Sequence, residues 1–198
     1  MNDAARPCGL LLVMMQPPTA MEEEFNAWYD TEHVPERLAV PGFLTGLRFV
    51  ATEGHPRYLA LYDMDGPDVL DSPGYLAVSG ENFSPWTRRV TGRVLVDRRA
   101  LRQVWPGRRL TGRPARLRLL RFRDIDDSAA LVAALRAAVA DQPGDDGLRV
   151  LADERPGCHF ALIEQVPCPP LKDLLHRLGP LASRIDLHLD YAPYDPRP

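Results

Sequence analysis

The sequence is poor in cysteine, contains no long apolar run and carries little net charge. Its 198 residues include three cysteines, Cys8, Cys158 and Cys168. These are too few and too scattered for a disulfide framework or a zinc ribbon, so we expect each to be a small buried hydrophobe. No apolar run approaches the roughly 20 residues that span a bilayer. Residues 1–7 lack the basic and apolar regions of a signal peptide, which predicts a cytoplasmic protein with no membrane partner.

Several motifs that carry chemistry are also missing. The chain has no phosphate-binding loop, no dinucleotide fingerprint and no Gly-x-Ser-x-Gly elbow around a nucleophile. The histidines of the second half, His159, His176 and His188, are scattered. His188 lies between Asp186 and Asp190, but three residues on an exposed strand face are weak support for a metal site. We therefore expect neither a bound metal nor a cofactor.

The charge is distributed unevenly although the formal net charge is only -3. Residues 88–123 hold thirteen arginines and one acid, Asp97, for a balance of +12, while residues 1–87 carry 4 - 13 = -9 and residues 124–198 carry 7 - 13 = -6. The run Arg116-Leu117-Arg118-Leu119 predicts a strand with one wet face. The flanking acidic segments offer partners within the chain, and no nucleic-acid-binding motif accompanies the arginines, so we expect no nucleic-acid partner.

Hydrophobic periodicity and turn signals predict a β-α-β-β-α-β order in the first half. A buried strand spans residues 8–15, and a helix runs from about Ala20, behind a Thr19/Glu22 capping box, to His33 or Val34, where Pro35 ends it. Residues 43–52 and 57–64 predict a hairpin. Residues 66–80 predict a short irregular helix, residues 81–92 a loop, and residues 93–104 contain the fourth strand.

The same order recurs after a proline- and glycine-rich linker. We divide the chain into a first unit at residues 1–106, a linker at 107–114 and a second, degenerate unit at 115–198. The second unit has predicted strands at 115–123, 148–152, 159–166 and 185–191 and predicted helices at 129–140 and 171–178. The fold class is therefore α+β, with two tandem ferredoxin-like units whose antiparallel sheets bury each other's open face and form an α/β barrel.

The first helix carries the densest group of candidate functional residues. On an α-helical wheel, one side holds Phe25, Trp28, Tyr29 and Glu32, and an adjacent side holds Asn26, Asp30, His33 and Arg37. Asp30 and His33 are three residues apart and can meet, which is a common way to orient a general base, although a surface pair at a helix end has the same spacing. A buried Glu32 would need a partner, for which Arg48 is a candidate.

Other aromatic residues extend this group. Tyr58 and Tyr62 lie on one face of a predicted strand, where they line a cavity or cap its edge. Trp86 either closes over a ligand or plugs the sheet. From their spacing alone, Trp28 and Tyr29 fit a solid core better than a pocket.

The segment from Phe25 to Phe49 resembles the EthD-like branch of the dimeric α/β-barrel superfamily. The resemblance rests on Phe25-Asn26-x-Trp28-Tyr29-Asp30-x-Glu32-His33-x-Pro35-Glu36-x-Leu38, on Pro41-Gly42-Phe43 and on Arg48-Phe49, and the strand Tyr58-Leu59-Ala60-Leu61-Tyr62 continues it. Members of the superfamily are ferredoxin-like units whose sheets pair into a barrel, usually across a dimer, with pockets between sheet and helices. The resemblance implies that His33 is an acid or base oriented by Asp30, and that Trp28, Tyr29 and Arg48 shape the pocket.

The resemblance implies two classes of function. One is a cofactor-free enzyme of the isomerase, decarboxylase or oxygenase type, which acts on a small apolar carbonyl or aromatic compound by proton transfer through His33. The other is a non-catalytic binding or accessory protein of a degradation pathway. Haem-using relatives exist, but the lone histidines of the second half match no haem motif, so we expect no haem. A homodimer remains an open alternative. The substrate-binding candidates are Trp28, Tyr29, Glu32, Arg48, Tyr58, Tyr62 and Trp86.

Overall fold

The computed structural model describes residues 8–140, 147–164 and 169–195. Eight strands alternate with helices in the order expected for each half. The strands are β1 (Gly9–Gln16), β2 (Leu47–Ala51), β3 (Tyr58–Met64), β4 (Leu95–Trp105), β5 (Leu117–Phe122), β6 (Leu148–Asp153), β7 (His159–Ile163) and β8 (Ile185–Pro193). The α-helices are α1 (Glu22–Trp28), α2 (Val34–Leu38), α3 (Pro73–Leu76), α4 (Pro85–Thr91), α5 (Ser128–Val139) and α6 (Leu171–Leu178).

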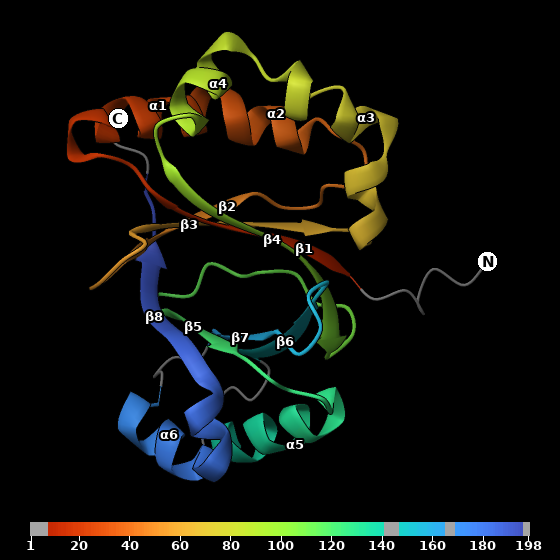
Figure 1. Cartoon of the computed structure of the whole chain (residues 1–198), viewed down its shortest axis with the longest axis vertical. Coiled ribbons are helices and arrows are strands. Elements are labelled where there is room, and N and C mark those ends of the chain that lie inside the picture. Colours follow the sequence, from red (N-terminus) through yellow and green to blue (C-terminus); the bar gives the residue numbers. More distant parts are fainter. Residues whose placement is uncertain (1–7, 141–146, 165–168, 196–198) are drawn as a thin grey trace.

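All eight strands form one closed antiparallel barrel in the order β1-β3-β2-β8-β5-β7-β6-β4. Two pairings, β2 with β8 and β4 with β6, join the strands of the first half to those of the second. Helices α1 to α4 cover the outside of β1–β4, and α5 and α6 cover the opposite side (Figure 1). The predicted α+β class and the barrel are confirmed. Closure within one chain satisfies the strand edges that an open sheet would expose.

Alternation along the strands separates two apolar layers. On β1, Leu10, Leu12 and Met14 point into the barrel, where they pack with the inward residues of the other strands. Leu11, Val13 and Met15 point outward and pack under α1 and its neighbours. The candidate residues of the first helix therefore lie outside the barrel, between the helices and the sheet.

One end of the barrel is closed by a fully buried ion pair. Arg149 Nη2 donates to Asp63 Oδ1 over 2.6 Å, and both side chains have 0% exposure. Gln103 and Thr111 accept from the remaining guanidinium nitrogens at 2.7 and 2.6 Å. Thr45 donates to Asp63 from a neighbouring loop. Because every guanidinium nitrogen and both carboxylate oxygens have partners, the two charges are retained inside the barrel.

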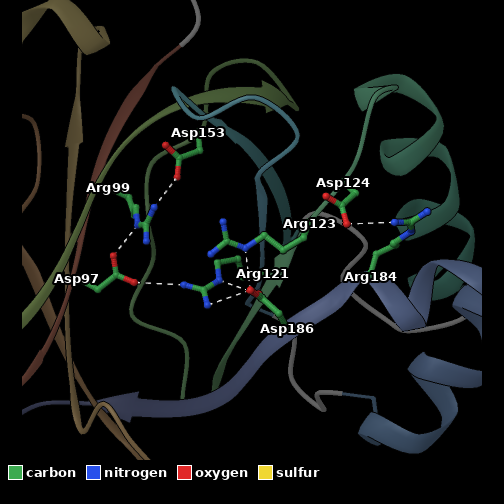
Figure 2. A network of polar contacts seen from close by, with 8 residues as sticks. All are labelled: Asp97, Arg99, Arg121, Arg123, Asp124, Asp153, Arg184 and Asp186. Atoms are coloured by element: carbon green, nitrogen blue, oxygen red, sulfur yellow. Dashed lines mark hydrogen bonds and ion pairs between the residues drawn. The ribbon is translucent and has the colours of Figure 1, made fainter.

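The other end carries a more exposed network of arginines and aspartates (Figure 2). Arg99 of β4 bonds Asp97 and Asp153, and Arg121 of β5 bridges Asp97 to Asp186. These contacts confirm that acids elsewhere in the chain pair with the arginine-rich segment. The expectation of one wet face on β5 is wrong at Arg118, which is 4% exposed. Asp190 neutralises its charge at 2.7 and 2.8 Å.

The first helix differs from the prediction at both ends. The capping box is wrong: α1 begins at Glu22 behind a 3-10 turn, η2 (Thr19–Met21), and no side chain caps it. The Glu22 carboxylate accepts instead from the Tyr58 hydroxyl and pairs with Arg57. The helical run also continues past Pro35 to Leu38, because a π-helical turn, η3 (Tyr29–His33), precedes the proline.

Residues 81–92 are not a loop. They contain the 3-10 turn η5 (Gly80–Asn82) and helix α4, for which Ser84 accepts from the Thr87 amide at 2.9 Å and Pro85 occupies the first turn. Serine followed by proline is a helix-start signal, so the sequence contained this information. Cys8 and Cys158 are buried free thiols, as expected, whereas Cys168 and the end of the predicted strand at 159–166 lie outside the described residues.

Candidate functional site

The π-turn η3 sets the geometry of the site. A π-turn pairs residues five apart, whereas an α-helix pairs residues three and four apart. His33 consequently lies against Trp28, five residues before it, with ring centroids 4.3 Å apart and a stacked interplanar angle of 30°. The Tyr29 ring meets His33 edge-on at 5.3 Å, and Tyr62 of β3 does so at 6.4 Å. Three aromatic rings therefore contact the imidazole, while His33 as a whole remains partly exposed.

His33 is a neutral base in this setting. Burial lowers the pKa of His33 to about 3, and the positive charges of Arg37 and Arg48 act in the same direction. Nδ1 is buried and has no hydrogen-bond partner, and neither has the Tyr62 hydroxyl, among the described residues. Burial raises the pKa of Tyr62 well above its ordinary value and that of Tyr29 to about 12, so both phenols keep their protons. The cluster holds an unprotonated nitrogen beside protonated hydroxyls.

The expected pairing of Asp30 with His33 is wrong. Arg48 Nη1 donates to Asp30 Oδ1 over 2.6 Å, and the Tyr194 hydroxyl donates to Asp30 Oδ2 over 3.0 Å. Arg48 also donates to Asn26 at 2.6 Å, and its guanidinium lies between the rings of Tyr29 and Tyr194, 4.3 and 3.9 Å from their centroids. The α-helical wheel predicted the wrong partner for Asp30 because it assumes 3.6 residues per turn, whereas η3 is a π-turn.

Glu32 has different partners from the one expected. Its Oε1 accepts from Ser84 Oγ at 2.6 Å and from Thr87 Oγ1 at 3.0 Å, and Trp28 Nε1 donates to Thr87 Oγ1 at 3.0 Å. Arg48 is therefore not the partner of Glu32. These bonds attach α4 to the helix that carries the site and fix the orientation of the Trp28 ring.

The two remaining aromatic candidates lie apart from His33. Tyr58 belongs to the Arg48 group, where its hydroxyl accepts from Asn26 at 3.1 Å. Trp86 of α4 is half-buried and donates to Glu24 of α1 at 3.1 Å.

Two grooves flank the Asp30–Arg48 pair. The larger, of about 860 Å³, is mostly polar and includes Glu22, Asn26, Arg57 and Tyr58. The smaller, of about 420 Å³, runs between α2 and β2 and includes Val34, Leu38, Gly46 and Arg48. A methyl group on Gly46 would lie 3.2 Å from Val34 and 3.3 Å from the Tyr62 ring. The glycine therefore leaves the smaller groove adjacent to the Tyr62–His33 cluster.

The sequence placed Arg37 beside His33 on the helical wheel but assigned it no role, because Pro35 was expected to end the helix. It did not single out Tyr194, which lies beyond the last predicted strand. Among the described residues, no group of three or more His, Cys, Asp and Glu side chains could hold a metal. No helix in that same part of the chain is long and apolar enough to cross a bilayer.

Protonation of His33 should make the fold sensitive to acid. A histidine in an unfolded chain has a pKa of about 6.5. Below that pH, His33 binds a proton in the unfolded chain but stays neutral in the folded chain until about pH 3. The stability due to neutral His33 is complete above pH 6.5 and is lost as the pH falls. We expect about 2 kcal/mol of this loss between pH 7 and pH 5.

Urea unfolding of wild type and His33→Gln at both pH values measures this loss. The variant should lose about 2 kcal/mol less than wild type over the interval. His176→Gln, on an exposed position of α6, is the matched control and should follow wild type. Equal losses for wild type and His33→Gln would contradict a buried, neutral His33.

Comparison with known proteins gives the fold. No protein-family model matches the chain, and no curated protein matches it. An anthrone oxidase-like protein is similar in structure at 13% identity, with 98% of this chain and 94% of that one covered and a TM-score of 0.57. A provisionally named monooxygenase from Lactobacillus acidophilus NCFM is similar at 9% identity. The match covers 96% of this chain and 94% of that one, with a TM-score of 0.57.

A haem-binding protein from Thermus thermophilus gives 8% identity, 96% and 92% coverage and a TM-score of 0.56. Identities this low establish the architecture and not the activity. The closed eight-stranded barrel and these neighbours together show that the chain has the dimeric α/β-barrel fold, here completed by its own two halves.

Proposed function

We propose that the chain is an EthD-like enzyme that removes a proton from a small, largely apolar carbonyl or aromatic compound, with His33 as the base. The observation that supports this most strongly is the buried, unpartnered Nδ1 of a neutral imidazole between Trp28 and Tyr62. A structural histidine in a core normally has partners for its ring nitrogens, because an unmade buried hydrogen bond costs about 1–3 kcal/mol. In the tautomer that carries its proton on Nε2, a substrate C–H or O–H group would meet an acceptor at Nδ1.

The proposed step is a proton transfer from a carbon beside a carbonyl group. The substrate C–H bond breaks, an N–H bond forms at His33 Nδ1, and the electron pair moves to the carbonyl oxygen to give an enolate. Burial disfavours the positively charged imidazolium that forms when His33 takes the proton. The negatively charged enolate must therefore form next to the ring, where the two opposite charges stabilise each other. The enolate then regains a proton at another carbon, which completes an isomerisation, or reacts with dioxygen.

The surroundings favour a flat, mostly apolar substrate. The rings of Trp28, Tyr29 and Tyr62 are buried and line neither groove, so a substrate would approach them from the smaller groove beside Gly46. Asp30 acts in this scheme as a positioning residue for Arg48, since it bonds Arg48 and not His33. The barrel closes within the chain, so the site does not require a second copy.

Haem does not fit the residues present in the second half. His176 and His188 are exposed. His159 Nε2 shares a 2.7 Å hydrogen bond with Ser128, while the space under α5 and α6 holds Leu131, Leu135, Leu174 and Leu178.

Anaerobic deuterium exchange tests the proposal. Anthrone is a suitable probe, because it is a flat aryl ketone with an acidic CH₂ group and because a structural neighbour is described as anthrone oxidase-like. In D₂O without dioxygen, the protein should accelerate loss of the CH₂ proton signal over buffer and over heat-denatured protein. Binding of anthrone without faster exchange would favour the alternative of a non-catalytic binding protein, and neither binding nor exchange would overturn the choice of substrate class.

A further inference from the structure

Arg37 is a buried cation with unused donors. Its side chain is 2% exposed, Nη2 donates to the Val78 carbonyl and to Glu36 Oε2 at 2.8 Å, and the guanidinium lies 5.2 Å from the centroid of the Tyr75 ring. Nε and Nη1 are buried without a hydrogen-bond partner among the described residues. Arg48 differs from Arg37 in that both of its terminal nitrogens donate hydrogen bonds, to Asp30 and to Asn26.

A continuous row of rings joins Arg37 to His33. Tyr75 stacks on Phe43 at 5.9 Å, Phe43 meets Tyr62 at 6.0 Å, and Tyr62 meets His33 at 6.4 Å. Arg37 is also four residues after His33, the spacing that brings two side chains to one helix face. Its charge is close enough to lower the pKa values of His33 and Tyr62. Unpartnered donors and an unpartnered acceptor thus lie along one row of buried rings, and none of these residues lines either groove.

Buried polar groups are almost always satisfied by protein, water or ligand. Two guanidinium nitrogens and the Tyr62 hydroxyl are donors, and the adjoining rings are apolar and flat. This combination matches an anionic oxygen carried on an unsaturated or aromatic skeleton. A doubly charged phosphate suits it less well, because Glu36 already neutralises part of the Arg37 charge.

We propose that Arg37 is the anion-binding, specificity-determining residue of the His33 site, and that the ligand carries a carboxylate or an equally charged enolate oxygen on a flat apolar frame. This inference rests on the proposed function for its location, but it makes a separate claim about binding. Arg37 and the Tyr62 hydroxyl would hold the oxygen, and His33 would meet the neighbouring carbon.

Paired ligands that differ only in charge test the claim. Isothermal titration calorimetry at pH 7 compares 2-naphthoate with the neutral 2-naphthamide. Wild type should prefer the carboxylate by about 10-fold or more, the size of one charge-assisted hydrogen bond. Arg37→Met should reduce the preference to within about 3-fold, and Arg37→Lys, which keeps the charge, should retain part of it. Arg89→Met, an exposed arginine paired with Glu24, is the matched control and should behave as wild type.

The outcomes separate the two proposals. No preference in wild type, or an unchanged preference in Arg37→Met, overturns the role of Arg37 even if anthrone exchange is catalysed. A preference that depends on Arg37, without any exchange, supports the anion site and removes the enzyme assignment. If Arg37→Met does not fold, the wild-type preference and the Arg37→Lys value still decide the question.

Discussion

Replacing Asp63 with alanine should lower the free energy of unfolding by about 3–5 kcal/mol, the usual cost of leaving one partner of a buried ion pair uncompensated. Arg149 would keep its charge inside the barrel with Gln103 and Thr111 as neutral partners. The nearest remaining acid is Glu164, 3.9 Å from Nη1, and burial already raises the pKa of Glu164. Denaturant unfolding monitored by circular dichroism measures the change.

Asp65→Ala supplies the control, since Asp65 forms an exposed pair with Arg108 at 3.0 Å. That variant should lose less than about 1 kcal/mol. The double replacement Asp63→Leu with Arg149→Met should recover much of the loss, because no charge is then buried. A small effect of Asp63→Ala would show that water reaches this end of the barrel.

Replacing His33 with glutamine should slow anthrone exchange by about 10²–10⁴-fold, the usual contribution of a general base. Glutamine fills similar space but accepts no proton at neutral pH. The variant loses the ring stack of His33 on Trp28, but Trp28 stays fixed by its bond to Thr87, so binding of anthrone should change much less than the exchange rate. Single-turnover exchange and calorimetric binding, measured on the same sample, separate the two effects.

Two variants sharpen this prediction. Asp30→Asn should affect exchange far less than His33→Gln, because Asp30 acts on Arg48. His176→Gln should leave exchange unchanged. Exchange that persists in His33→Gln would show that another residue is the base. A loss of exchange in Asp30→Asn equal to that in His33→Gln would support a functional pairing of Asp30 with His33.

Much of the fold was predictable because each half repeats the same simple signals. The alternation in Ile185–Tyr191, the Asp127 cap of α5 and the turns between β2 and β3 are local, and the structure follows them. Barrel closure followed from the need to bury two open sheet faces. The inward arginines were not predictable, because the pairing of Arg149 with Asp63 joins residues 86 positions apart.

The sequence anticipated which side chains lie together better than it anticipated their contacts, and their functional roles stay a prediction. The sequence selected His33, Trp28, Tyr29 and Tyr62, and the structure brings them together. It assigned the wrong partners to Asp30 and Glu32, because a single π-turn changes which residues share a face and a helical wheel does not contain that turn. Arg37 was given no role for a related reason, because Pro35 was treated as the end of the helix.

The state of the His33 ring is the central claim, and an NMR titration of the imidazole C–H signals from pH 4 to pH 8 tests it most directly. The His33 signals are assigned by their disappearance in His33→Gln. Since burial beside Arg37 and Arg48 lowers the pKa of His33 to about 3, its signals should stay constant from pH 8 to pH 5. A titration of those signals with a midpoint near 6.5 would show that the folded ring takes up a proton near neutral pH and would contradict the account of the site.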